Sequence, residues 1–325
     1  MGRTSDIIRL FREIFAGSRP FMGLLTLIIL MGTSYLIITF LGLLLAMPFF
    51  SISWQELQHI IEGGMDEINN GLLYYLQAIQ TTGLFLVPAL IARTILFDQS
   101  RKYFPERYSG NVLTGFLVLL TLLISAPVLQ WIIKWNIEIK LPDALKQLET
   151  TLRTMEEERI QVAERLMAGR NWHIFFIDIV VISILPALGE EFFFRGTLQR
   201  ILANWFRNMH LGIFITAICF SASHFQFYGF FPRLLLGIYF GYLYYWSRNI
   251  WIPALAHFLN NTIAISLSFL VTEPVRGISG LFSWLGNTSV MILIPSIVIS
   301  TMLIVLTYRI LSKDSFNKNS GQQFY

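Results

Sequence analysis

The sequence predicts an all-α, polytopic transmembrane helical bundle of about eight spans. Hydrophobic residues make up 54% of the 325 residues, charged residues only 14%, and the mean hydropathy is +0.59. These values lie far from those of a soluble globular domain of similar length. Several uncharged runs also approach the roughly 20 apolar residues that a helix needs to cross a bilayer. Membrane lipid is therefore the first expected partner.

The expected spans form two groups, three before and five after a long polar segment. In order, they are Phe21–Phe50, Gly71–Ala92, Asn111–Ile133, Trp172–Leu188 with the charged motif that follows it, Leu211–Phe227, Leu234–Trp246, Ile250–Val271 and Val290–Leu306. The first run is too long for the apolar region of a cleaved signal peptide, so we expect it to remain as a membrane anchor.

Basic residues in the short loops indicate the orientation. Arg3, Arg9, Arg12 and Arg19 precede the first span, whereas Ser51–Asn70 has no Lys or Arg. By the positive-inside rule the N-terminus is cytoplasmic, and an even number of spans returns the C-terminus to that side. The net charge is only +4, and many basic residues sit near the ends of apolar runs, so no nucleic-acid partner is expected. The expected location is the bacterial cytoplasmic membrane.

The polar segment between spans three and four predicts an amphipathic helix outside the bilayer, over Asp143–Gly169. Its apolar residues alternate at spacings of three and four: Leu145, Leu148, Leu152, Met155, Val162 and Leu166. Packing against the same chain is the ordinary meaning of such a stripe. A docking surface for a partner, a neighbouring subunit or the membrane surface is the alternative. The polar tail, Lys313–Tyr325, is expected to be disordered.

Three charged groups occur in the apolar segment Gly189–Arg195. A carboxylate in hydrocarbon is costly, so such residues begin as candidates for a functional site. Glu191 and Arg195 are four apart, lie on one helical face and can form a structural ion pair. Glu190 points elsewhere without a sequence-local counter-ion. It is suited to accept and return a proton near neutral pH, with a polar helix contact as the alternative.

Two later spans add further polar side chains. His224 lies in an apolar run, and His257 and Asn261, four apart, share a helical face. The latter two could donate to an oxyanion, or they could hydrogen-bond between helices. A lone buried His224 is by itself more often structural. If these three meet Glu190 in one partly hydrated cavity, the set suits hydrolysis of an amide by an activated water.

At these residues the chain resembles the CPBP intramembrane proteases, relatives of the CAAX prenyl endopeptidases and of the abortive-infection and bacteriocin self-immunity proteins. Glu190, Glu191 and Arg195 match the EExxxR motif, Phe220–His224 matches FxxxH, and His257–Asn261 matches HxxxN. The resemblance covers about residues 173–271, the predicted catalytic membrane core. Residues 1–172, with N-terminal membrane helices and the amphipathic loop helix, and residues 272–325, with the final membrane helix and tail, flank it.

The resemblance implies a CAAX-protease-like intramembrane endopeptidase of the glutamate type. In this scheme Glu190 with His224 activates a water molecule, and His257 with Asn261 holds the oxyanion. Glu191 and Arg195 support the site, and no cofactor is required. Ser221 and Ser223 lie near His224, but no companion acid completes a serine triad.

Zinc is the alternative cofactor, because Glu190, His224 and His257 could supply one carboxylate and two imidazoles. The absence of an HExxH pair on one helix argues against it, and Asn261 suits an oxyanion better than a zinc ion.

Two other classes of function remain alternatives. One is a non-catalytic membrane scaffold or bacteriocin-immunity protein of the same fold. The other is a transporter, which the absence of a repeated Glu-Glu motif disfavours. For a protease, a prenylated protein, a peptide pheromone, a bacteriocin-like peptide and a membrane protein all fit as substrates. We expect the site nearer the cytoplasmic side, because Glu190 and His257 lie close to cytoplasmic ends of their spans.

Overall fold

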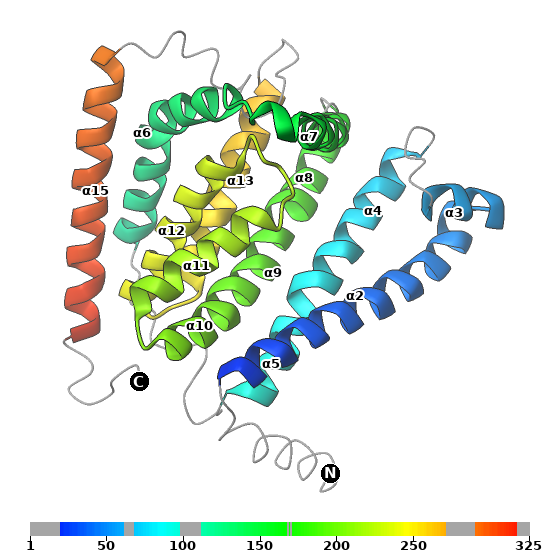
Figure 1. The fold of residues 1–325 in the computed structure, drawn as a ribbon, viewed down its shortest axis with the longest axis horizontal. Helices are drawn as coiled ribbons and strands as arrows, with labels where there is room; N and C mark the ends of the chain where they lie inside the picture. Colours follow the sequence, from blue (N-terminus) through cyan, green and yellow to red (C-terminus); the bar gives the residue numbers. More distant parts are fainter. Residues whose placement is uncertain are drawn as a thin grey trace, which may run out of the picture.

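The structure is a computed structural model that describes residues 20–61, 68–97, 112–167, 169, 171–270 and 290–316. Every regular element in these ranges is a helix, which confirms the predicted all-α fold (Figure 1). The α-helices are α2 (Pro20–Phe50), α3 (Trp54–Ile61), α4 (Asn70–Thr81), α5 (Val87–Leu96), α6 (Val112–Ile137), α7 (Lys146–Met167), α8 (Trp172–Asp178), α9 (Leu185–Phe193), α10 (Gln199–Phe206), α11 (Met209–Ala222), α12 (Phe230–Ser247), α13 (Trp251–Leu270) and α15 (Val290–Phe316). The arginines at 3, 9, 12 and 19 lie outside the described residues. So do residues 317–325 of the predicted polar tail, whereas residues 313–316 continue α15.

Among the described residues, six helices are long and apolar enough to cross a membrane: Pro20–Phe50, Asn70–Leu96, Val112–Ile137, Trp172–Phe206, Trp251–Leu270 and Val290–Ser312. The other two predicted spans are helices that do not meet this measure. α11 has 14 residues, about 21 Å in length against a hydrocarbon core of about 30 Å. α12 has 18 residues but contains Arg233 and four tyrosines. The prediction of about eight full spans is therefore too high by this measure.

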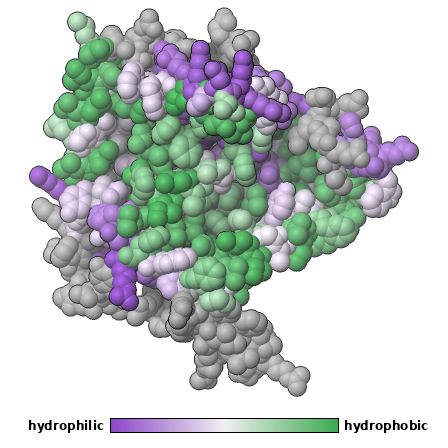
Figure 2. All heavy atoms as spheres, viewed as in Figure 1, coloured by the Kyte–Doolittle hydropathy of each residue, from purple (hydrophilic) through white to green (hydrophobic). Residues whose placement is uncertain are grey.

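Figure 1 shows the order of the helices across the bundle. α2 and the α4–α5 pair lie together on one side, where α4 and α5 pack against α9 and α2 packs against α10, and α6 packs with α15 on the opposite side. α9 to α13 lie between them, and α7 crosses one end of the bundle. Hydrophobic side chains cover the body of the bundle, and hydrophilic ones gather at the end where α7 lies (Figure 2). The distribution is typical of a chain with a lipid-facing belt.

Two of the spans are rods in which α-helical and π-helical turns alternate. η1 (Thr82–Leu86) joins α4 to α5, and η3 (Ile179–Ile184) and η4 (Phe194–Leu198) lie on either side of α9. Pro88 follows η1 and Pro186 follows η3, each at the start of an α-helix. A proline ring clashes with the carbonyl four residues earlier and has no N–H to donate to it, so widened turns before these prolines have a local cause.

The predicted amphipathic helix forms as a 3-10 turn, η2 (Asp143–Leu145), followed by α7. Val162 and Leu166, near its C-terminal end, pack in a cluster with residues of α2 and α4. Leu145 and Leu148, at the other end of the stripe, are 45% and 48% exposed. The stripe therefore packs against the same chain at its C-terminal end, whereas its first two leucines are exposed.

The boundaries of two spans differ from prediction in ways that affect the site. α11 ends at Ala222, five residues before the predicted end at Phe227, and Phe225 has a left-handed φ of 51°. His224 consequently lies in the turn after the helix. The rod that contains Glu190 continues to Phe206, so Glu190 lies near its middle, and the expectation that it sits near a cytoplasmic helix end is wrong.

Candidate active site

Glu190 and Glu191 lie on α9 and are both buried, with 7% and 0% exposed. Arg195 Nη1 donates to Glu191 Oε1 at 2.8 Å, which is the ion pair expected from their spacing. Arg195 Nη2 also donates to the Gly237 carbonyl at 3.0 Å, and its guanidinium lies 4.5 Å from the centre of the Phe220 ring. These contacts offset part of the cost of burying both charges.

Glu191 also contacts a residue that the sequence spacing does not indicate. His257 Nδ1 lies 2.9 Å from the same atom, Glu191 Oε1. Arginine keeps its charge and can only donate, so Glu191 is a carboxylate and His257 Nδ1 must carry a hydrogen. Glu191 thus fixes the tautomer and the ring orientation of His257. The other ring nitrogen, Nε2, is left to face Glu190.

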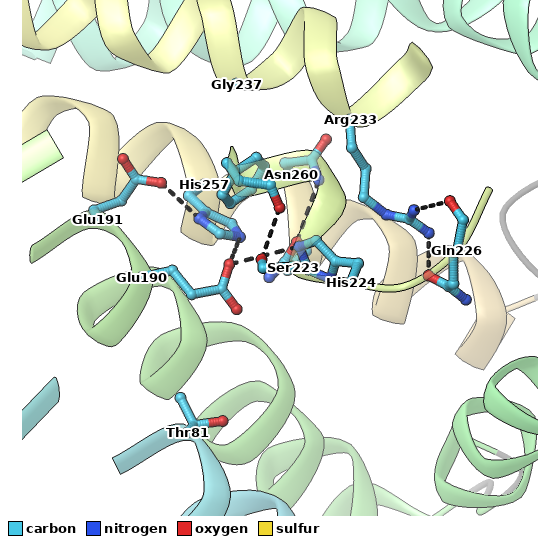
Figure 3. A network of polar contacts seen from close by, with 12 residues as sticks. Thr81, Glu190, Glu191, Ser223, His224, Gln226, Arg233, Gly237, His257 and Asn260 are labelled. Carbon is cyan, nitrogen blue, oxygen red and sulfur yellow. Dashed lines mark hydrogen bonds and ion pairs between the residues drawn. The ribbon is translucent and has the colours of Figure 1, made fainter. Parts of the chain in front are cut away.

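The Glu190 carboxylate lies between two imidazoles, as Figure 3 shows. Glu190 Oε2 is 3.8 Å from His224 Nε2 and 4.0 Å from His257 Nε2. Both separations are too long for direct hydrogen bonds. Glu190 Oε2 and His224 Nε2 are also buried atoms with no hydrogen-bond partner among the described residues. Their geometry lets one water molecule bond to both atoms.

Aromatic rings enclose this polar group. Phe240 stacks on His257 with ring centres 5.4 Å apart, and Phe220 meets His224 and His257 edge-on at 5.3 and 5.8 Å. His224 itself is not sealed, because 31% of its side chain is exposed. Apolar walls strengthen the electrostatic interactions inside, and the exposed side of His224 gives access.

Asn261 contacts a backbone carbonyl of the glutamate-bearing rod. Its Nδ2 donates to the Ile182 carbonyl at 3.3 Å, and its Oδ1 accepts from Asn260 Nδ2 at 3.2 Å. Ile182 lies four residues before Pro186, which has no N–H to donate back to it. Asn261 thus bonds to a carbonyl to which Pro186 offers no N–H. One amide hydrogen of Asn261 therefore makes an interhelical hydrogen bond, the alternative to an oxyanion role that the sequence leaves open.

Arg233, on the first turn of α12, is a site neighbour that sequence reasoning missed. It lies beside His224 and donates to Gln226 through both Nη atoms (Figure 3). A side chain at Gly229 would collide with the guanidinium, 2.6 Å away. The sequence does contain a signal for Arg233, because a charged residue flanked by apolar residues is a candidate for a functional site by the same criterion that applies to Glu190.

The three residues considered for zinc meet at the site, but their spacing is too wide for one ion. Two ligands bound to one tetrahedral zinc ion at about 2.1 Å lie roughly 3.4 Å apart, whereas Glu190 Oε2 lies 3.8 Å from His224 Nε2 and 4.0 Å from His257 Nε2. In the described part of the chain, no group of three His, Cys, Asp or Glu side chains is placed to hold a metal ion. Glu190, His224 and His257 thus do not fit a zinc ion as arranged.

Comparisons with known proteins identify the same segment. Residues 172–263 match the family model of the Type II CAAX prenyl endopeptidase Rce1-like proteins. The uncharacterized protein YpbD of Bacillus subtilis (strain 168) is 28% identical over 89 residues, which cover 26% of this chain and 42% of YpbD. The chain therefore matches less than half the length of this relative. No solved structure matches. The resemblance to CAAX-type membrane proteases is confirmed over residues 172–263, the segment that carries Glu190, His224 and His257.

Proposed function

We propose that this protein is an intramembrane endopeptidase that hydrolyses a peptide bond of a membrane-associated or prenylated peptide or protein. The observation that carries the proposal is the placement of Glu190 Oε2 within 3.8 Å of His224 Nε2 and 4.0 Å of His257 Nε2. An acid from α9, an imidazole from the turn after α11 and an imidazole from α13 meet there, with separations that one bridging water molecule can span. Membership of the matched segment in a CAAX-protease family model supports the same reaction class.

The proposed reaction begins with water held between Glu190 and His224. The Glu190 carboxylate accepts a proton from this water while the hydroxide adds to the carbonyl carbon of the peptide bond. The C–N bond of the tetrahedral intermediate then breaks, and Glu190 gives its proton to the leaving nitrogen. The enzyme returns to its starting state without a covalent intermediate.

The oxyanion of that intermediate needs donors on the opposite side of the carbonyl. His257 Nε2 faces the site and donates when its ring carries a second proton, and the Glu191 carboxylate 2.9 Å from Nδ1 holds the ring in this orientation. Asn261 has a second amide hydrogen besides the one directed at Ile182, and we assign it the other donor role. Arg195 holds Glu191 in place.

We further propose that the protein lies in a bacterial cytoplasmic membrane with both termini on the cytoplasmic side. The beginning of α2 and the end of α15 lie at the same end of the bundle, opposite α7 (Figure 1). The matched relative is bacterial. With this orientation α7 lies outside the cytoplasm.

Profiling of new peptide termini tests the function directly. Membranes of a host without the gene are compared after complementation with the natural sequence or with Glu190→Gln, which keeps the side-chain shape but removes the base. We expect a set of termini that only the natural sequence produces. Identical termini from Glu190→Gln would favour the non-catalytic scaffold and overturn the protease.

The glutamate mechanism is distinguished from a zinc mechanism by exhaustive chelation of the purified protein. Hydrolysis should continue unchanged after chelation. Loss of hydrolysis that only added zinc restores would replace the proposed mechanism with a metal-dependent one.

A further inference from the structure

α7 is the most highly charged helix near the site, and it lies outside the segment that matches the family model. Its sequence places three glutamates in a row, of which Glu157 and Glu158 are exposed. Glu156 is only 8% exposed. A buried carboxylate on a polar surface helix is unusual and calls for a bonding partner.

The partner of Glu156 is the backbone of the segment that follows His224. Glu156 Oε2 accepts a hydrogen bond from the Tyr228 backbone N–H at 2.7 Å. One turn earlier on α7, the Arg153 guanidinium lies 4.0 Å over the Tyr228 ring. Arg153 and Glu156, on successive turns of α7, therefore both contact Tyr228 in the loop between α11 and α12.

A second side chain holds the same loop from α6. Asn136 is fully buried, its Nδ2 donates to the Phe227 carbonyl, and its Oδ1 accepts from the Phe231 N–H, each at 3.2 Å. Glu156 and Asn136 together thus bond three backbone groups of residues 227–231. Both come from the part of the chain before residue 172.

The loop needs external support because its own conformation is strained. Phe225, next to His224, has a left-handed φ of 51° and a side chain that is 62% exposed. A bulky residue in this region is held only when its surroundings impose the conformation. His224 lies after the last residue of α11, so its position relative to Glu190 depends on how this loop is held.

We propose that Glu156, assisted by Asn136, is a positioning residue that keeps His224 at the Glu190 carboxylate. The inference rests on the proposed function for its catalytic consequence, but the restraint on the loop is independent of it. It gives α7 a role in the reaction: the helix fixes the strained turn that presents the water-binding imidazole.

Two conservative substitutions separate the hydrogen bond from the charge. Glu156→Gln keeps a side-chain oxygen at the same reach and loses the charge, whereas Glu156→Asp keeps the charge but is one methylene too short for the Tyr228 N–H. Glu157→Asp is the matched control on the exposed face. All four proteins are purified as full chains. Amide hydrogen exchange is measured at residues 225–229, together with the rate at which diethyl pyrocarbonate modifies His224.

We expect Glu156→Asp to raise exchange at Tyr228 and modification of His224 about tenfold, while Glu156→Gln stays within about threefold of the natural protein. On a substrate identified by terminal profiling, Glu156→Asp should lower kcat about tenfold or more with little change in KM. Equal exchange and modification in the Asp and Gln variants would overturn the positioning role. If the natural protein hydrolyses nothing while the exchange difference holds, the proposed function fails and the restraint on the loop stands.

Discussion

The carboxylate of Glu191 holds both Arg195 and His257 through one oxygen atom, Oε1, at 2.8 and 2.9 Å. Arg195 comes from the same helical rod and His257 from α13, so this atom joins the glutamate-bearing helix to the helix that presents the second imidazole. All three side chains are almost completely buried.

Glu191→Gln should therefore be strongly destabilising. The change leaves the buried Arg195 charge without its counter-ion, an effect that typically lowers the free energy of unfolding by about 3 to 5 kcal/mol. Thermal unfolding of the detergent-purified protein measures it. Glu149→Gln, which removes the pair with Arg153, whose side chain is 42% exposed, is the control and should shift the midpoint far less. Equal shifts in the two variants would contradict the account of Glu191.

Asn261→Ala should lower both stability and hydrolysis, because Asn261 donates to the Ile182 carbonyl and so joins α13 to the glutamate-bearing helix. The expected loss in unfolding free energy is about 1 to 2 kcal/mol. Asn260→Ala, which removes only the donor to Asn261 Oδ1, should cost less. An Asn261→Ala protein of natural stability that has lost hydrolysis would indicate an oxyanion role alone.

Gly212→Ala should loosen the hairpin of α10 and α11. A Cβ at Gly212 would lie 2.8 Å from the backbone of Ala203, and overpacking of this kind costs about 1 to 3 kcal/mol. A Cβ at Gly32 meets nothing within 4 Å, so Gly32→Ala should leave stability unchanged or raise it by up to about 1 kcal/mol. Unfolding midpoints of the two variants, measured side by side, compare the close approach with the open position. Similar effects would mean that the two helices do not pack this closely.

Burial raises the pKa of Glu156 above its ordinary value of 4.5, and the hydrogen bond from Tyr228 opposes this only in part. A carboxyl with a raised pKa in the folded state favours folding while it is protonated, and that contribution is lost as pH rises through the raised pKa. Glu156→Gln does not titrate. Its unfolding midpoint, relative to that of the natural protein, should therefore increase from pH 4 upward and then level off. A constant or falling difference would show that Glu156 is not buried as described.

The sequence predicts the helices well and their junctions poorly. Apolar runs of span length locate the six helices that can cross a membrane, because lipid selects such runs directly. The sequence does not predict the end of α11, because no Asp, Glu, Lys or Arg occurs between Leu211 and Phe227. The break depends on the left-handed turn at Phe225. The sequence does not predict the π-helical turns either. Pro88 and Pro186 indicate that the α-helical hydrogen bonding is interrupted, but not that the interruption takes the form of a π-helical turn.

The sequence predicts the ion pair of Glu191 with Arg195 and the meeting of Glu190 with the two histidines, but not the other bonds that hold these residues. Glu190, His224 and His257 are conspicuous because polar side chains in lipid are costly, so they need one another or water. The hydrogen bond between Glu191 and His257 joins residues 66 positions apart, and helical periodicity predicts only contacts within one helix. The hydrogen bond that the Tyr228 N–H donates to Glu156 is not predictable from the sequence. Which of three consecutive glutamates is buried depends on how α7 packs against the rest of the chain.

The most direct measurement of the central claim is the rate of peptide hydrolysis by purified protein in lipid nanodiscs, on a substrate found by terminal profiling. Glu190→Gln and His224→Ala should each lower kcat by about 100-fold or more, as expected for loss of a general base or of the residue that binds its water. Ser223→Ala, in the same turn, should hydrolyse the substrate at close to the natural rate. Hydrolysis by Glu190→Gln at the natural rate would contradict the account.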